Sequence, residues 1–303
     1  MTRSLIIAVL LATTGTAAAQ TAGGPPIAYV KSVSNGDEIH LVSPDGTERL
    51  RIYKARSKVQ IRMMDLRPGG GEVAFLENLY ALKILAFDDY GRPLPGNPRE
   101  IRRVSSPCGV ESPDYHPTNG TLLFVEGCGR DRAIWTVQSG ASQRDASPLL
   151  SSFAVFRARW SRLGDFIYYV GLRDNAGTND PTYLYRRTTE TGTPDELGPL
   201  DGFSTFDVTR QGEKVFWSVG NGTFKLLDLG VAGATTVTAP VLECPRGMRM
   251  SYSPSDSEMV YSTSAFNGGN YVMVGPTNCA TPSTLTGKGS WGWVDWRPNT
   301  VTP

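Results

Sequence analysis

The sequence has little of what metal-dependent and nucleophilic enzymes require. Its 303 residues include only two histidines, His40 and His116, and four cysteines, which form no Cys-x-x-Cys pair. Zinc sites of ordinary spacing need more such residues close together, so the composition does not favour one. No Gly-x-Ser-x-Gly motif marks a nucleophile elbow. His116 falls beside Asp114 without a candidate nucleophile, which disfavours a catalytic role for this histidine.

Charge of one sign and long apolar runs are also missing. The formal net charge is +1, which gives no long-range electrostatic basis for binding nucleic acid. The longest apolar run lies at residues 5–12, and its length of about 8 residues is well below the roughly 20 needed to cross a bilayer. We therefore expect no nucleic-acid partner and no membrane span.

The N-terminus has the pattern of an export signal. Arg3 provides a positive charge, the apolar run follows it, and Ala17, Ala18 and Ala19 form a small-residue cleavage site before Gln20. An apolar first strand or helix is the alternative. We predict a signal peptide over residues 1–19, cleaved near Ala19, a linker over residues 20–26, and a periplasmic or secreted mature chain.

The composition of the remaining chain favours strands and turns. It is rich in glycine and proline, with 33 and 21 residues in the whole sequence, and the segments between them are short. Thr, Val, Tyr and Trp are common in those segments, which is typical of strands. The composition predicts an all-β protein.

A short motif recurs six times along the chain and begins a repeat. The fourth residues of its copies are 49, 45, 48, 44 and 44 positions apart. The copies are Asp65-Leu66-Arg67-Pro68, Asp114-Tyr115-His116-Pro117, Arg159-Trp160-Ser161-Arg162, Asp207-Val208-Thr209-Arg210, Ser251-Tyr252-Ser253-Pro254 and Asp295-Trp296-Arg297-Pro298.

Each complete repeat then contains two further apolar segments and a polar one. The second strands are predicted at residues 72–75, 122–125, 166–169, 214–217 and 258–261, and the third at 82–87, 133–137, 183–187, 224–229 and 271–274. The fourth segment is rich in Thr, Pro and charge, which suits an exposed edge strand. Four strands in about 45 residues make one propeller blade.

The two ends of the chain complete each other. The last copy, at residues 295–298, begins a repeat that stops there, while residues 27–30 and 38–42 match a second and a third strand. We therefore predict a six-bladed β-propeller over residues 27–298, with a tail at 299–303, whose last blade joins a C-terminal inner strand to N-terminal outer strands. A β-sandwich with coincidental turns is the alternative.

The repeats resemble the TolB-like propeller repeat of the WD40-like (PD40) kind. Blades of that family carry a Trp-Ser-Pro-Asp-Gly type of turn, and the closest copies here are residues 159–165 (RWSRLGD) and 251–256 (SYSPSD). No copy has the complete turn. The resemblance covers about residues 27–298 and implies a periplasmic home and a protein or peptide partner of the cell envelope.

Cysteine spacing predicts a disulfide within one blade. Residues that face each other across an antiparallel hairpin have residue numbers with a constant sum, which is 237 for a turn at residues 117–120. The numbers of Cys108 and Cys128 sum to 236, so these cysteines should lie nearly opposite each other. Two buried thiols are the alternative. Cys244 and Cys279 would pair only if all four cysteines are oxidised, and their geometry stays open.

The first position of the repeat motif supplies the candidate binding site. Because innermost strands line the channel of a propeller, these six side chains should share one level at a channel mouth. Four carboxylates there could hold a Ca²⁺ ion or a basic peptide. Alternatively, each Asp caps a turn or bonds to the backbone of its own blade. The six residues are Asp65, Asp114, Arg159, Asp207, Ser251 and Asp295.

Three functions follow from this sequence. The first is an exported, non-catalytic scaffold that binds a protein or peptide at one channel mouth, without a resident cofactor. The second is a hydrolase or lyase that uses channel-mouth carboxylates. The third is an accessory that bridges partners in an envelope complex. The tryptophan-rich segment 290–296 could be an aromatic binding platform, although a core strand is the simpler interpretation.

Overall fold

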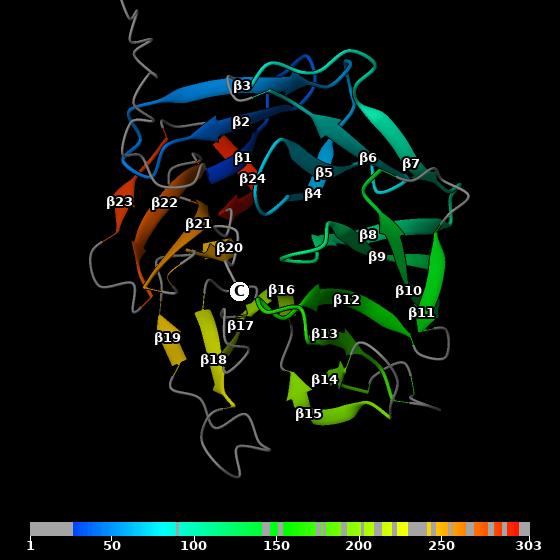
Figure 1. The fold of residues 1–303 in the computed structure, drawn as a ribbon. Coiled ribbons are helices and arrows are strands. Elements are labelled where there is room, and N and C mark those ends of the chain that lie inside the picture. Colours follow the sequence, from blue (N-terminus) through cyan, green and yellow to red (C-terminus); the bar gives the residue numbers. More distant parts are fainter. Residues whose placement is uncertain are drawn as a thin grey trace, which may run out of the picture.

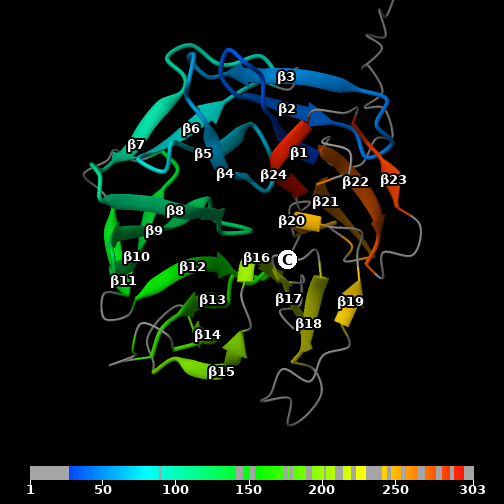
Figure 2. The same cartoon turned by 180° about the vertical axis from the view of Figure 1, so that it is seen from behind.

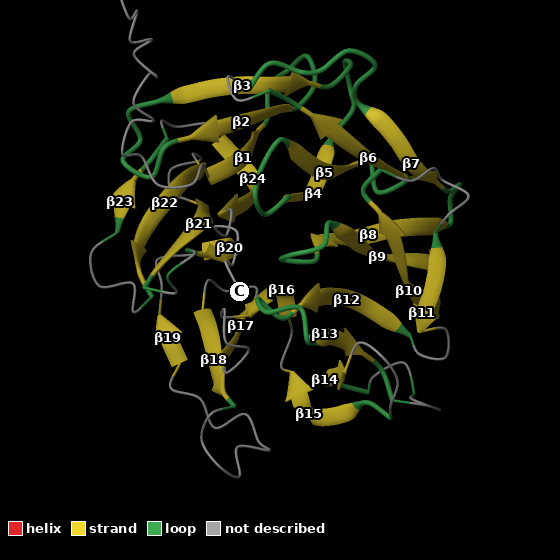
Figure 3. Cartoon of the chain, viewed as in Figure 1, coloured by secondary structure: helices red, strands yellow, loops and turns green. Residues whose placement is uncertain are grey.

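The structure is a computed structural model in which the chain forms a ring of β-sheets (Figure 1). It describes residues 27–88, 91–140, 146–150, 154–173, 177, 180–188, 193–200, 203–208, 214–219, 223–229, 241–243, 247–253, 255, 257–264, 270–277, 282–286 and 290–296. Within these residues every regular element is a strand, as Figure 3 shows. The part of the chain just specified contains no helix long and apolar enough to cross a membrane.

The strands form six four-stranded antiparallel sheets around a central axis, seen from both sides in Figures 1 and 2. Five sheets each come from one contiguous part of the chain, which confirms the repeat as the structural unit. Their strands are β4 (Ile61–Leu66), β5 (Glu72–Glu77), β6 (Ala81–Ala86) and β7 (Arg99–Arg103); β8 (Cys108–Tyr115), β9 (Thr121–Cys128), β10 (Asp131–Gln138) and β11 (Ser147–Leu150); β12 (Val155–Trp160), β13 (Phe166–Gly171), β14 (Thr182–Thr188) and β15 (Asp195–Leu200); β16 (Phe203–Val208), β17 (Lys214–Val219), β18 (Thr223–Asp228) and β19 (Val241–Glu243); and β20 (Gly247–Tyr252), β21 (Glu258–Ser264), β22 (Asn270–Pro276) and β23 (Ser283–Thr284).

The sixth sheet joins the two ends of the chain. Its order is β24-β1-β2-β3, where β24 is Ser290–Trp296, β1 is Ile27–Lys31, β2 is Glu38–Val42 and β3 is Arg49–Lys54. Ile27 pairs with Trp296, and Ala28 pairs with Asp295. The predicted closure of the ring is therefore confirmed.

The second strand of each blade forms its core. In β5 the four residues 73–76 are completely buried, and so are residues 122–125 of β9. Successive side chains of a strand point to opposite faces, so consecutive burial requires cover on both faces, which the neighbouring blades provide. This explains why the sequence shows continuous apolar runs there instead of an alternating pattern.

The predicted disulfide Cys108–Cys128 is present. The two residues pair directly across β8 and β9, with their Cα atoms 4.0 Å apart. Asp114 pairs with Leu123, which gives the predicted index sum of 237, and a bulge between Glu111 and Asp114 shifts the register by one. That shift brings the cysteines into register at 236. Cys244 and Cys279 lie outside the described residues, as do the predicted signal peptide, linker and tail.

Candidate functional site

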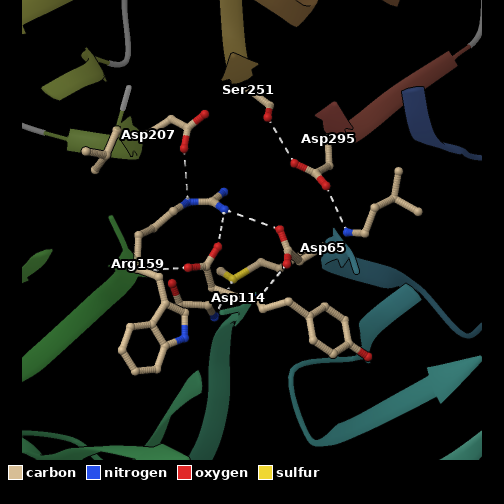
Figure 4. Close-up of polar contacts among 12 residues, drawn as sticks. Asp65, Asp114, Arg159, Asp207, Ser251 and Asp295 are labelled. Carbon is tan, nitrogen blue, oxygen red and sulfur yellow. Dashed lines mark hydrogen bonds and ion pairs between the residues drawn. The ribbon is translucent and has the colours of Figure 1, made fainter. Parts of the chain in front are cut away.

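The six side chains predicted to share one level meet on the propeller axis (Figure 4). Each lies near the end of an innermost strand, at the position before the last residue of β4, β8, β12, β16, β20 or β24. We call these six residues the inner ring. Five of them are buried: Asp65 and Asp114 are 6% exposed, Asp207 2%, Asp295 1% and Ser251 0%.

Every carboxylate of the inner ring accepts a backbone N–H from the next blade. In three of these bonds the donor lies one repeat after the acceptor in the sequence. In the fourth, the donor Leu66 lies in the blade next to the sheet that joins the N-terminal and C-terminal strands. The pairs are Asp65 Oδ2 with Tyr115 N–H at 2.7 Å, Asp114 Oδ2 with Trp160 N–H at 2.5 Å, Asp207 Oδ2 with Tyr252 N–H at 2.8 Å, and Asp295 Oδ2 with Leu66 N–H at 2.8 Å.

The other two members complete the circle. Arg159 Nε donates to the carbonyl of Phe206 at 3.2 Å, and Ser251 Oγ donates to Asp295 Oδ1 at 2.9 Å. Each inner-ring residue thus contacts the blade that follows it. The expectation of backbone bonds within the same blade is wrong, because the side chains extend around the axis to the next strand and not back into their own turn.

The centre of the inner ring is occupied by a guanidinium group. Arg159 Nη1 lies 2.8 Å from Asp114 Oδ1 and 3.5 Å from Asp65 Oδ1, and its Nε lies 3.9 Å from Asp207 Oδ1 (Figure 4). Arg162 Nη2 adds a second cation, 2.9 Å from Asp207 Oδ2. Two arginines therefore offset part of the negative charge of the four inner-ring carboxylates.

The Ca²⁺ site considered from the sequence does not fit this arrangement. Among the described residues no group of three His, Cys, Asp or Glu side chains is placed to hold a metal ion. Arg159 fills the position between the carboxylates that a cation would need.

Burial sets the protonation equilibria of the inner ring. It raises the pKa of Asp65 well above its ordinary value, and the carboxylates of Asp295 and Asp114 raise it further. Burial also raises the pKa of Asp114 to about 6, against the lowering effect of Arg159. The pKa of Arg159 is raised by the four surrounding carboxylates despite the opposing effect of burial, so the guanidinium stays charged.

Described residues line two small openings, one on each side of the inner ring. The turn-side opening lies among Pro68, Pro117, Trp160 and Arg162, with Asp65, Asp114 and Asp207 at its base. Its cavity volume is about 10 Å³, room for about one water molecule. A direct contact between the inner ring and a partner therefore stays a prediction, limited to the three carboxylates that line this opening.

The strand-start opening, on the other side, is lined by a layer that the sequence analysis missed. Side chains alternate along a strand, so the residues two positions before the inner ring also face the axis. We call this layer the second ring and define it as Met63, Ser112, Arg157, Arg249 and Trp293. Met63, Ser112, Arg157 and Trp293 line a cavity of about 10 Å³ with Met64, Pro113, Arg159 and Phe206. The sequence could have predicted the second ring, because its members lie two residues before the first residue of each repeat motif.

His116 has a structural role between two blades. Its Nε2 lies 3.2 Å from the carbonyl of Gly164, and its Nδ1 accepts the backbone N–H of Thr118 at 3.2 Å. The imidazole packs edge-on against Trp160, with the ring centroids 4.7 Å apart. Both ring nitrogens are thus engaged by backbone groups, and burial lowers the pKa of His116.

Solved structures share this arrangement of blades. TolB from Acinetobacter baumannii superimposes with a TM-score of 0.70 at 17% identity, over 90% of this chain and 67% of its own. The fold is a TolB-like propeller. A putative TolB from Agrobacterium tumefaciens gives a TM-score of 0.62 at 13% identity, over 88% of this chain and 94% of its own.

TolB-like propellers are not the only proteins that share this architecture. An oligogalacturonate lyase from Vibrio parahaemolyticus gives a TM-score of 0.54 at 10% identity, over 84% of this chain and 86% of its own. The sequence matches no protein-family model and none of the curated proteins compared with it. At these identities the likeness establishes the fold, and function has to be argued from the site.

Proposed function

We propose that this protein is an exported, non-catalytic scaffold that binds a protein or peptide partner across one mouth of its channel. The observation that carries the proposal is the filled centre of the propeller. Among the described residues, the cavity on each side of the inner ring has a volume of about 10 Å³. Small-molecule sites usually have about 300–1,000 Å³, so a partner would bind over the mouth instead of entering it.

The chemistry of the inner ring also favours a scaffold over an enzyme. A general acid or base needs a carboxylate within reach of substrate. Here the four carboxylates accept backbone amides of the next blade, and Arg159 lies between three of them. Their interactions stabilise the contacts between blades. The lyase named above keeps a propeller enzyme as the second candidate, which the experiment below separates.

Export is part of the proposal. The Cys108–Cys128 disulfide fits an oxidising compartment, and the pattern of residues 1–19 fits a signal peptide. TolB from Acinetobacter baumannii has the same propeller fold. A partner in the cell envelope would be consistent with all three observations.

Site-specific photo-crosslinking tests the proposal. A benzophenone side chain is placed at Leu163, in the turn between β12 and β13, and separately at Arg62, in the strand-start half of β4. The matched control is Leu94, which is 44% exposed, like Leu163 at 45%, and lies in the loop before the outer strand β7. Crosslinks formed in the intact envelope are identified by mass spectrometry.

We expect a defined protein to crosslink from one mouth position and not from Leu94. Crosslinking only from Leu94 would place the binding surface on the outer edge and contradict the proposal. Turnover of a glycan or peptide that is lost in both Asp65→Asn and Asp114→Asn, with the fold retained, would establish the enzyme instead.

A further inference from the structure

Beside the second ring, two arginines share one carboxylate among the described residues. Glu111 forms ion pairs with Arg157 and with Arg132, the latter at 2.8 Å, so one carboxylate is shared by two guanidinium groups. Arg157 also donates through Nη1 to the carbonyl of Phe156 at 2.9 Å. Its buried Nε has no hydrogen-bond partner among the described residues. A buried donor without a partner is unusual and marks a position where an acceptor is needed.

A second arginine approaches the same opening from β20. The guanidinium of Arg249 lies over the ring of Trp293, 4.1 Å from its centroid. Burial, together with the charges of Arg249 and Arg159, lowers the pKa of Arg157 to about 9. Burial and Arg62 lower the pKa of Arg249 to about 10. Both groups remain protonated at neutral pH and repel each other.

The remaining wall of the opening is apolar. Met63, Met64, Pro113, Phe206 and Trp293 line the cavity that Arg157 enters. Aromatic and methionine side chains next to arginine are the composition of protein-binding hot spots. Cations inside an apolar rim favour an anion that carries an apolar neighbour.

We propose that the second ring binds an acidic side chain of a protein partner, with an adjacent apolar side chain of that partner against the rim of the strand-start opening. This inference rests on the proposed function and specifies the mouth and the chemistry of its partner. A carboxylate accepts hydrogen bonds from guanidinium groups with well-matched geometry and compensates their charge. A cavity of about 10 Å³ is too small to enclose a sugar ring, which favours an aspartate or glutamate presented at the rim over a uronic acid.

Peptide selection on the folded, oxidised protein tests this inference. Displayed random peptides are selected for binding, and the affinities of the enriched sequences are measured for the natural chain, Arg157→Gln and Arg249→Gln. The control variant is Arg173→Gln, which removes a guanidinium that pairs with Glu196 and is 55% exposed outside both openings. Oligogalacturonate is titrated in parallel as a second probe.

We expect enriched peptides to contain Asp or Glu beside an aromatic or aliphatic residue. Each second-ring variant should weaken binding by about tenfold or more, and Arg173→Gln should not. Arg249→Glu should bind a peptide whose acidic residue is replaced by lysine better than the original peptide, which keeps the test decisive if Arg157→Gln does not fold. Binding should also weaken as salt increases.

Three results would overturn the inference. Enrichment of peptides without acidic residues, or affinities unchanged in both second-ring variants, would remove the carboxylate site while leaving the scaffold function intact if the mouth still crosslinks a partner. Tight binding of oligogalacturonate with no peptide binding would assign the arginines to a sugar acid. Absence of any crosslinked partner would instead contradict the proposed function itself.

Discussion

The backbone amide of Leu66 donates a 2.8 Å hydrogen bond to Asp295 Oδ2, although 229 residues separate the two in the sequence. This bond links the blade that contains both chain ends to the blade that follows it. The same bond recurs between Asp65 and Tyr115 at 2.7 Å, one repeat further on. The inner ring is therefore a continuous set of blade-to-blade contacts.

Loss of the central guanidinium should be strongly destabilising. In Arg159→Leu, the carboxylates of Asp65, Asp114 and Asp207 would stay buried without their shared cation. Removing one partner of a buried ion pair costs about 3–5 kcal/mol. We expect a decrease of this size in the free energy of unfolding, measured by urea denaturation.

The exposed pair of Arg173 and Glu196 provides the control for this change. Surface ion pairs contribute about 0–1 kcal/mol, so Arg173→Leu should have little effect. A loss below about 1 kcal/mol in Arg159→Leu would show that the inner ring does not depend on its central charge.

Asp65 should make stability fall as the pH rises. Burial and the neighbouring carboxylates raise the pKa of this carboxyl group above its unfolded value, so the folded state holds its proton more tightly. The stability contributed by the protonated group is complete below the unfolded pKa and is lost as the pH rises through the folded pKa. In Asp65→Asn the side-chain oxygen can still accept the hydrogen bond from the backbone amide of Tyr115, but the side chain no longer titrates.

The free energy of unfolding of Asp65→Asn, relative to the natural chain, should therefore increase from about pH 4 to about pH 8. Urea denaturation at a series of pH values measures the difference. A difference that is independent of pH would mean that Asp65 titrates at the same pH in both states.

His116 should have the opposite pH dependence. Burial lowers the pKa of its imidazole, so the folded state resists protonation. Stability is then lost as the pH falls below the unfolded value of about 6.5, where only the unfolded chain takes up the proton. The variant His116→Gln should not show this loss of stability at low pH.

Proton NMR can follow the two histidines separately, because the chain contains only His40 and His116. The signal that is absent from His116→Gln should titrate below about pH 6.5 in the natural chain. A midpoint above that value would contradict the neutral imidazole assigned to the folded state.

The Cys108–Cys128 disulfide should stabilise one blade. The sequence separation of 20 residues corresponds to about 3 kcal/mol of loop entropy removed from the unfolded chain. Cys108→Ser with Cys128→Ser should lower the free energy of unfolding by about that amount. The natural chain should become equally unstable with reductant, and an unchanged midpoint in the double variant would contradict the expectation.

The sequence could predict this fold because a propeller repeats its geometry at fixed intervals. The spacing of the motifs fixed the level of Asp65 and Asp114 and brought Ile27 next to Trp296. Spacing gives the height of a residue on its blade but not the direction of its side chain. The acceptor of each carboxylate lies on the next blade, which depends on the packing angle between sheets.

Long side chains account for the other omissions from the predicted site. Arg162 lies in the turn between β12 and β13 and reaches Asp207, 45 residues further along the chain, at 2.9 Å. Only the folded ring shows that this contact joins two neighbouring blades. The repeat gives the level of Arg157 and Arg249, but the electrostatic repulsion between them is seen only where β12 and β20 converge on the axis.

The sheet that joins both chain ends has a consequence for biogenesis. In a polypeptide that emerges N-terminus first, β1 appears before every other strand. Its partner on the inner edge is β24, which appears last. Until β24 pairs with it, the inner edge of β1 has unpaired backbone donors and acceptors. A partner that spans both sides of the seam could therefore recognise only chains whose translocation has brought β24 into place.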